Sequence, residues 1–174
     1  MRWTLDEVEA ELLRTLIASL AEVLAGADPR DVAVQRLFPR TVTGDDDADA
    51  ELRGLIHEDL AGVKRAGLDA LAALLDGGSR RGAGLRVELS PDDTLLVLGV
   101  LNDVRLAIGA RIGIEQLDRD DVDPDSSLGH RLAVMDHLGL WQEMLLAIVD
   151  PPAVRIHDLD LPDDLGPTEH GPDT

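Results

Sequence analysis

The sequence contains no cysteine and no tyrosine, and aromatic residues make up only 2% of its 174 positions. Without cysteine, the chain excludes disulfide bonds, thiolate catalysis, cysteine-ligated zinc and thiol redox sensing. The aromatic residues present are Trp3, Phe38 and Trp141. A core must therefore be built from leucine, valine, isoleucine and alanine, which favours packing of helix on helix over a β-sandwich.

Basic residues are also scarce, since 16 Lys and Arg stand against 35 Asp and Glu, for a net charge of −19. Nucleic-acid binding normally requires a basic surface, and the nearest approach to one is two short clusters, Lys64-Arg65 and Arg80-Arg81 with Arg86. Direct nucleic-acid binding is therefore not expected. Charge complementarity favours a basic protein partner, although negative charge can also serve solubility alone.

Long hydrophobic runs are absent. No uninterrupted stretch reaches about 18 apolar residues, the length that a membrane-spanning helix needs. Met1-Arg2-Trp3 leads directly into charged positions, which is unlike a secretory signal. We therefore expect a cytoplasmic protein without a membrane span. Hydrophobic residues form 44% of the chain, enough for one folded helical domain over residues 1–150. Residues 151–174 form an acidic tail, rich in Pro and Asp, that we expect to be mostly disordered.

The spacing of apolar residues predicts an N-terminal helix that opens with a capping box of Thr4 and Glu7. Its apolar positions are Leu5, Val8, Leu12, Leu16, Leu20 and Val23. Asp28-Pro29 then has the character of an N-cap and first position, so a short helix is predicted from there to about Leu37.

A longer helix is predicted from Ala48 to Asp76, and the pattern allows a break near His57-Glu58. The apolar stripe in its second part consists of Leu60, Val63, Gly67, Leu71 and Leu74. Residues 79–84 are predicted to form a flexible basic turn. Leu85–Leu89 alternates apolar and polar residues, which indicates a short strand. The other alternating stretch is Val154–Ile156, so a two-stranded pairing of these segments is one prediction.

Ser90-Pro91 predicts the start of a helix that extends to Ile112, because serine is a strong N-cap and proline suits the first turn. An acidic loop at Glu115–Ser127 leads to a last helix, Leu128–Val149, which ends before Pro151. The predicted fold is all-α. It is a bundle of four main helices plus a short helix, with a minor strand or two-stranded pairing.

Three polar residues interrupt the apolar segment Val100–Ile114. At 100° per residue, Arg105 points into the apolar face, Asn102 borders that face and Asp103 points nearly the opposite way. An unpaired buried charge is costly, so Arg105 is expected to bond a carboxylate or carbonyl on the last helix or on the Leu52–Leu75 helix. This bond could be a core salt bridge that fixes helix register, or part of an anion or ligand site. Asp103 is predicted to be the residue most free to meet a partner.

Metal and catalytic motifs are weak in this sequence. Asp121, Asp123 and Asp125 alternate as at the start of a calcium loop, but the later positions of that motif do not follow. His130 and His137 lie too far apart along one helix for a typical zinc pair. No nucleophile elbow and no phosphate-binding loop occurs. We expect no enzyme, no cofactor and no bound metal.

Several segments resemble a known actinobacterial family. They are EAELLRTLIASLAEVL in the first helix, RLFP at Arg36–Pro39, DADAELRGLIHEDL, LRVELSPDDTLLVLGVLNDVRLAIGARIGI and HLGLWQEML. The run L-N-D-x-R-L-x-x-G at Leu101–Gly109 is the most specific of them. The family is a domain of unknown function, numbered two thousand and seventeen, whose members are labelled AosR-like oxidative-stress transcriptional regulators. The resemblance covers most of residues 1–150 and includes no catalytic motif.

The resemblance implies a cytoplasmic stress-response regulator that acts with the transcription machinery, through a protein partner such as a sigma factor or polymerase. A redox role would require cysteines, which this chain lacks. The family's genes tend to lie near the adaptor of the Clp protease, which implies an alternative role as a proteostasis adaptor or scaffold. A further alternative is a ligand-binding helical bundle centred on Arg105. The oligomeric state stays open.

Overall fold

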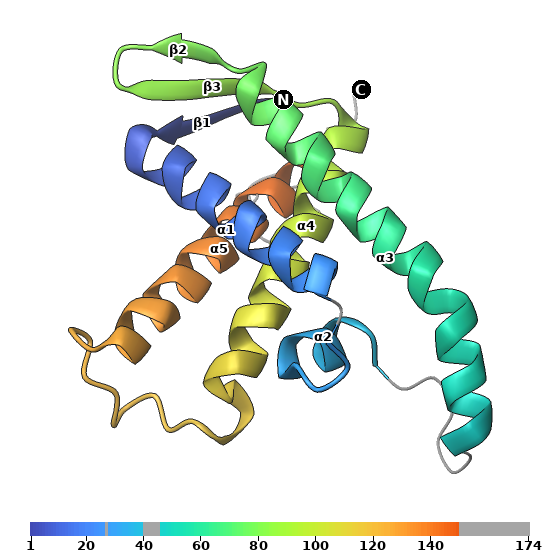
Figure 1. Cartoon of the computed structure of the whole chain (residues 1–174). Helices are drawn as coiled ribbons and strands as arrows, with labels where there is room; N and C mark the ends of the chain where they lie inside the picture. Colours follow the sequence, from blue (N-terminus) through green and yellow to red (C-terminus); the bar gives the residue numbers. More distant parts are fainter. Residues whose placement is uncertain (27, 40–45, 150–174) are drawn as a thin grey trace, which may run out of the picture.

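The computed structural model describes residues 1–26, 28–39 and 46–149, with side chains left out at 46–58 and at 81. Figure 1 shows a helical body with a small sheet at one end. The elements follow in the order β1 (Arg2–Asp6), α1 (Glu7–Gly26), α2 (Val32–Leu37), α3 (Asp46–Asp76), β2 (Ser79–Arg81), β3 (Gly84–Glu88), α4 (Pro91–Ile112), η1 (Ile114–Gln116) and α5 (Ser127–Val149). The prediction of a mainly helical fold with four long helices and one short helix is confirmed.

The sheet has three strands in the order β1-β3-β2, where the sequence predicted one strand or a pair. β1 pairs antiparallel with β3, and Trp3 lies opposite Val87. The predicted strand at Leu85–Leu89 is confirmed with a shift of one residue. The predicted basic turn is partly wrong, because Ser79–Arg81 forms β2 and pairs with β3. The proposed partner strand at Val154–Ile156 lies outside the described residues.

The N-terminal capping box lies two residues later than predicted. Thr4 belongs to β1, whose alternating pattern buries Trp3 and leaves Thr4 exposed. The cap is instead formed by Asp6 and Glu9: each backbone N–H donates to the other's carboxylate, both at 2.8 Å. Because the strand occupies the first residues, the helix begins at Glu7 and its buried face shifts. That face consists of Ala10, Leu13, Ile17, Leu20 and Leu24.

The predicted apolar stripes of α1 and α3 are therefore wrong at several positions. Val8 is 77% exposed and Val63 is 68% exposed. In α3 the buried positions past the undescribed side chains are Ala61, Leu68, Leu71 and Leu75. The helix also continues without a break through His57-Glu58. Tertiary neighbours decide the phase here, since α3 contacts α1, α4 and β3 along one side only.

The short helix α2 begins later than predicted. Asp31, rather than Asp28, is its N-cap and accepts a hydrogen bond from the Ala33 N–H at 2.8 Å. Asp28 instead closes a turn by accepting from the Arg30 N–H. α2 packs mainly against α4, so it covers the same helix that carries the three polar candidate residues.

The predicted α4 and α5 are confirmed, with α5 starting one residue early at Ser127. The Ser90 side chain and the Asp93 carboxylate form a reciprocal capping box at the start of α4. At its other end, Gly113 adopts φ +64°, a left-handed conformation that glycine accepts without strain. α4 and α5 are therefore two antiparallel helices joined by η1 and the acidic loop, as Figure 1 shows.

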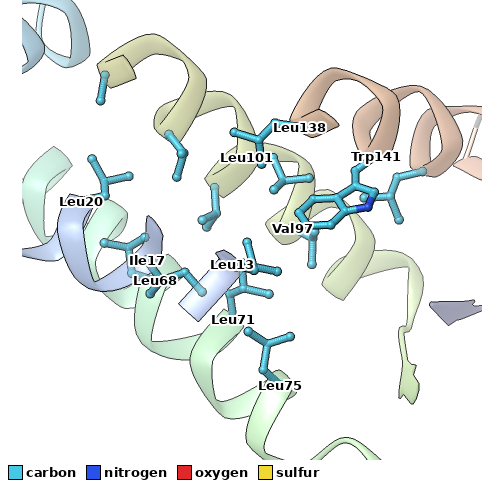
Figure 2. Packing of buried hydrophobic residues seen from close by; sticks show 14 of the residues in the cluster. Leu13, Ile17, Leu20, Leu68, Leu71, Leu75, Val97, Leu101, Leu138 and Trp141 are labelled. Carbon is cyan, nitrogen blue, oxygen red and sulfur yellow. The ribbon is translucent and has the colours of Figure 1, made fainter. Parts of the chain in front are cut away.

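The core lies where α1, α3, α4 and α5 meet below the sheet. Figure 2 shows that each of these helices contributes buried side chains, among them Leu13, Leu71, Leu101 and Trp141. Trp141 meets Trp3 of β1 in an edge-to-face arrangement, with ring centroids 5.6 Å apart. Burial of each such large side chain stabilises the fold by about 1.5–3 kcal/mol. Because Trp3 and Trp141 lie near opposite ends of the described chain, their contact joins both ends to one core.

Candidate functional site

Arg105 lies on the side of α4 that faces α5, and its side chain is half-buried. Its Nη1 donates to the side-chain oxygen of Gln142 at 2.5 Å. Gly139 lies against the same guanidinium, and an added Cβ there would stand 3.6 Å from the Arg105 Cζ. The prediction that Arg105 bonds a carbonyl oxygen on the last helix is confirmed.

Among the described residues, the guanidinium of Arg105 does not form the core salt bridge that was one of the predicted alternatives. Its partner, Gln142, is neutral, and no carboxylate in the described part of the chain pairs with it. Its Nε is buried and makes no hydrogen bond among the described residues. A charge in partly desolvated surroundings is unfavourable without a counter-charge, so this cation is only partly satisfied.

Asp103 is not free, which corrects the prediction for this residue. Its carboxylate accepts a hydrogen bond from the Lys64 ammonium at 2.6 Å, across the contact of α4 with α3. Both side chains are only about 15% exposed, at 16% for Lys64 and 15% for Asp103. The pair is therefore part of the packing of these two helices and does not belong to a surface that is open to a partner.

Asn102 is exposed and makes no hydrogen bond among the described residues, whereas the sequence placed it at the border of the core. Together with Arg105 it lines a pocket of about 470 Å³ between α2, α4, η1 and α5. The other polar side chains of this pocket are Gln35, Arg36, Glu115 and Gln116. Apolar contacts come from Val32, Leu106, Ile114 and Met135. We call this site the Arg105 pocket.

An ion pair holds one wall of the Arg105 pocket in place. Arg111, near the end of α4, donates to the Asp31 carboxylate at 2.8 Å and so joins α4 to the start of α2. This hydrogen bond, followed by that from the Ala33 N–H, lowers the pKa of Asp31 below its ordinary value. The position of α2 is thus fixed by a charged cap as well as by its buried residues Ala33, Val34 and Leu37.

The second notable feature is an exposed apolar stripe on α5. Leu140, Met144 and Ile148 follow at intervals of four residues, so they form one line along the helix. They are 52%, 44% and 52% exposed. Leu146 and Val149 are also exposed, at other positions around α5. We call Leu140, Met144 and Ile148 the α5 stripe.

The composition of α5 matches its exposure. Within the described residues it is the one helix long and apolar enough to cross a membrane by length and composition, with a mean hydropathy of 1.4. Only 22% of that window is buried. Core helices of soluble proteins also pass this test, and α5 buries Leu138, Trp141 and Leu145 in the shared core. Because α5 contains no uninterrupted apolar run of about 18 residues, the sequence pattern did not predict that this helix could span a membrane.

The candidate metal ligands do not gather in the described part of the chain, where no group of three His, Asp or Glu side chains could hold an ion. His137 contacts Glu9 at 3.0 Å and the Trp141 ring at a centroid distance of 4.5 Å. His130 is exposed. In the acidic loop, Asp123 accepts a hydrogen bond from the Asp125 N–H, which shapes a turn.

One of these features has a signal in the sequence, and two have none. The stripe on α5 has a signal, because Leu140, Met144 and Ile148 repeat at helical spacing beside the buried face. The contribution of α2 to the Arg105 pocket has none, since nothing in a short helix indicates which long helix it covers. Pairing of Asp103 with Lys64 likewise depends on how α3 crosses α4.

The chain was compared with family models, with curated proteins and with solved structures. No curated protein and no solved structure matches it. A family model described as a domain of unknown function (DUF2017) matches residues 1–149, which is nearly the whole of the described chain. The protein therefore belongs to the DUF2017 family.

Proposed function

We propose that this protein is a cytoplasmic regulator that acts through contacts with proteins of the transcription machinery, and that its partner docks on the α5 stripe. The observation that carries the proposal is the exposure of Leu140, Met144 and Ile148 on one face of α5. Soluble proteins rarely leave a contiguous row of large apolar side chains open to water unless the row serves an interaction.

The charge of the chain favours one kind of occupant for this stripe. With a net charge of −19, a second copy of the chain, an anionic membrane and a nucleic acid are all repelled. A protein with a basic surface around an apolar patch is attracted instead, and its encounter is accelerated. Sigma factors and RNA polymerase bind DNA and therefore carry basic surfaces.

The resemblance to AosR-like regulators points to the same class of partner. The proposal leaves out a thiol redox sensor, because the chain has no cysteine. It also assigns no catalytic step: the Ser90 hydroxyl donates to the Asp93 carboxylate at 2.7 Å, but this pair forms the capping box of α4. The role is that of a docking protein whose presence on its partner changes what that partner does.

A binding experiment with purified proteins tests this proposal. Sigma factors and RNA polymerase from the source organism are titrated with the full chain and with a Leu140→Asp/Met144→Asp double variant. We expect the double variant to lose at least about tenfold in affinity, because two carboxylates are placed in the apolar contact. Val63→Asp is the control, as Val63 is an apolar residue on α3 that is exposed at least as much as Leu140 and Met144. It should bind as the unchanged protein does.

Other outcomes would contradict the proposal. If neither sigma factor nor polymerase binds while components of the Clp protease do, the protein is a proteostasis adaptor. If the chain sediments as a dimer that the double variant disrupts, the occupant is a second copy. If it co-sediments with lipid vesicles, α5 is a membrane-binding helix. An equal loss of affinity in Val63→Asp would show that charge alone, and not the stripe, is responsible.

A further inference from the structure

The Arg105 pocket combines three properties that a docking protein does not require. It has a volume of about 470 Å³, which falls within the range of small-molecule sites. Its lining combines polar and apolar side chains, and α2, α4 and η1 each contribute both kinds. It also lies apart from the α5 stripe, because Met135, the residue of α5 that lines the pocket, projects from the face of the helix opposite Met144 at 100° per residue.

The side chains that line this pocket have a net charge opposite in sign to that of the whole chain. Arg36 is paired with Glu115 at 3.2 Å, so these two charges offset each other. Arg105 has no acidic partner in the described part of the chain, although the sequence contains 35 acidic residues. The pocket therefore carries a surplus positive charge in a protein with a net charge of −19.

The hydrogen bonds of Arg105 leave capacity for a ligand. A guanidinium carries five N–H donors, and here Nη1 binds Gln142 while the buried Nε has no partner among the described residues. Asn102, one turn earlier on α4, likewise has no hydrogen-bond partner in the described part of the chain, and it can donate from its amide. An anion at this position would satisfy both residues.

We propose that the Arg105 pocket binds a small organic acid with one carboxylate and an apolar body. The carboxylate pairs with the Arg105 guanidinium and the Asn102 amide, and the body lies against Leu106, Ile114 and Met135. One uncompensated cation matches one negative charge. A phosphate dianion would meet the surrounding negative field with a single counter-charge, which disfavours it. This proposal does not depend on the function proposed for the α5 stripe.

The experiment titrates the full chain with straight-chain carboxylates from acetate to octanoate, and with the matching alcohols, by isothermal titration calorimetry. We expect affinity to rise with chain length among the carboxylates and to be at least about tenfold weaker for each alcohol. Hexyl phosphate is a further probe, which separates a carboxylate site from a general anion site. Tighter binding of the phosphate than of hexanoate would overturn the assigned ligand class.

Two variants test the assigned residues. Arg105→Met should abolish binding, and Asn102→Asp, which places a carboxylate at an exposed position, should weaken it at least about tenfold. Arg65→Met, an exposed arginine on α3, is the control and should bind as the unchanged chain does. Circular dichroism confirms that each variant is folded. Unchanged binding in a folded Arg105→Met or Asn102→Asp, or no binding of any carboxylate below about 1 mM, would overturn the proposal.

Discussion

The Arg105 guanidinium donates to the Gln142 side-chain oxygen at 2.5 Å, so a cation of α4 is held by a neutral group of α5. This bond joins two helices that also share a large apolar contact. Because Gln142 also approaches the Leu98 carbonyl at 3.5 Å, a single amide spans the Arg105 side chain and the backbone of α4.

This relationship predicts a coupling between the two residues. Gln142→Leu should lower the free energy of unfolding by about 1–3 kcal/mol, because it leaves a half-buried cation without its acceptor. Arg105→Met removes that cation and keeps much of the apolar stem. The double variant should therefore lose less than the sum of the two single losses. Urea denaturation of the four proteins measures the difference, and strict additivity would contradict a direct interaction.

A second prediction concerns the ion pair of Lys64 and Asp103 between α3 and α4. Asp103→Ala should destabilise the protein by about 1–3 kcal/mol, since it leaves the Lys64 ammonium poorly solvated and unpaired. Replacing both residues, as Lys64→Met with Asp103→Leu, should restore most of this loss. Urea denaturation again supplies the free energies. A neutral Asp103→Ala would mean that the pair is open to water in solution.

A third prediction compares two glycines in helices. A Cβ at Gly129 would lie 2.4 Å from the Asp123 carbonyl oxygen, where the acidic loop crosses the first turn of α5. Gly129→Ala should therefore destabilise the fold by about 1–3 kcal/mol, despite the better helix propensity of alanine. Gly62→Ala has no atom within 4 Å of its added Cβ and should instead stabilise α3 by about 0.5–1 kcal/mol. Thermal unfolding of both variants distinguishes these opposite signs.

The fourth prediction is a pH dependence that involves Asp31. The hydrogen bond from Arg111 lowers the pKa of the folded Asp31 below that of the unfolded chain. Its contribution to stability is thus complete above a pH of about 4 and is lost as the pH falls through the lower, folded pKa. Asp31→Asn should cost stability at neutral pH, and this cost should shrink in acid. Asp92→Asn, which breaks no hydrogen bond in the described chain, should show no comparable trend.

The sequence predicted the features that depend on neighbouring residues better than those that depend on residues far away along the chain. The helix cap at Ser90 and the ends of α4 and α5 follow from local chemistry, so they were predicted within a residue. β1 was missed because its alternating residues were read as the first turn of a helix. A strand of this length becomes stable only through pairing with β3, whose partner residues lie 78 to 86 positions away along the chain, from Asp6 with Gly84 to Arg2 with Glu88.

The candidate site divides in the same way. Helical geometry was sufficient to predict that Arg105 points into the apolar face of its helix and Asp103 away from it, but it left two helices open as the location of the Arg105 partner. It could not supply the identity of the partner, because Gln142 and Lys64 are brought in by helices whose crossing is set by the whole core. The Arg105 pocket requires α2 and η1 as well, so its shape depends on four elements at once.

The order β1-β3-β2 has a consequence for how this protein can meet other chains. The central strand is paired on both sides, and the edges are short: β1 has five residues and β2 has three. Charged Arg2 and Asp6 stand at the ends of β1, and Arg80 lies in β2. Short, charged edges resist the addition of a further strand. The sheet is therefore protected against strand-by-strand aggregation, and recognition by this protein is left to its helices.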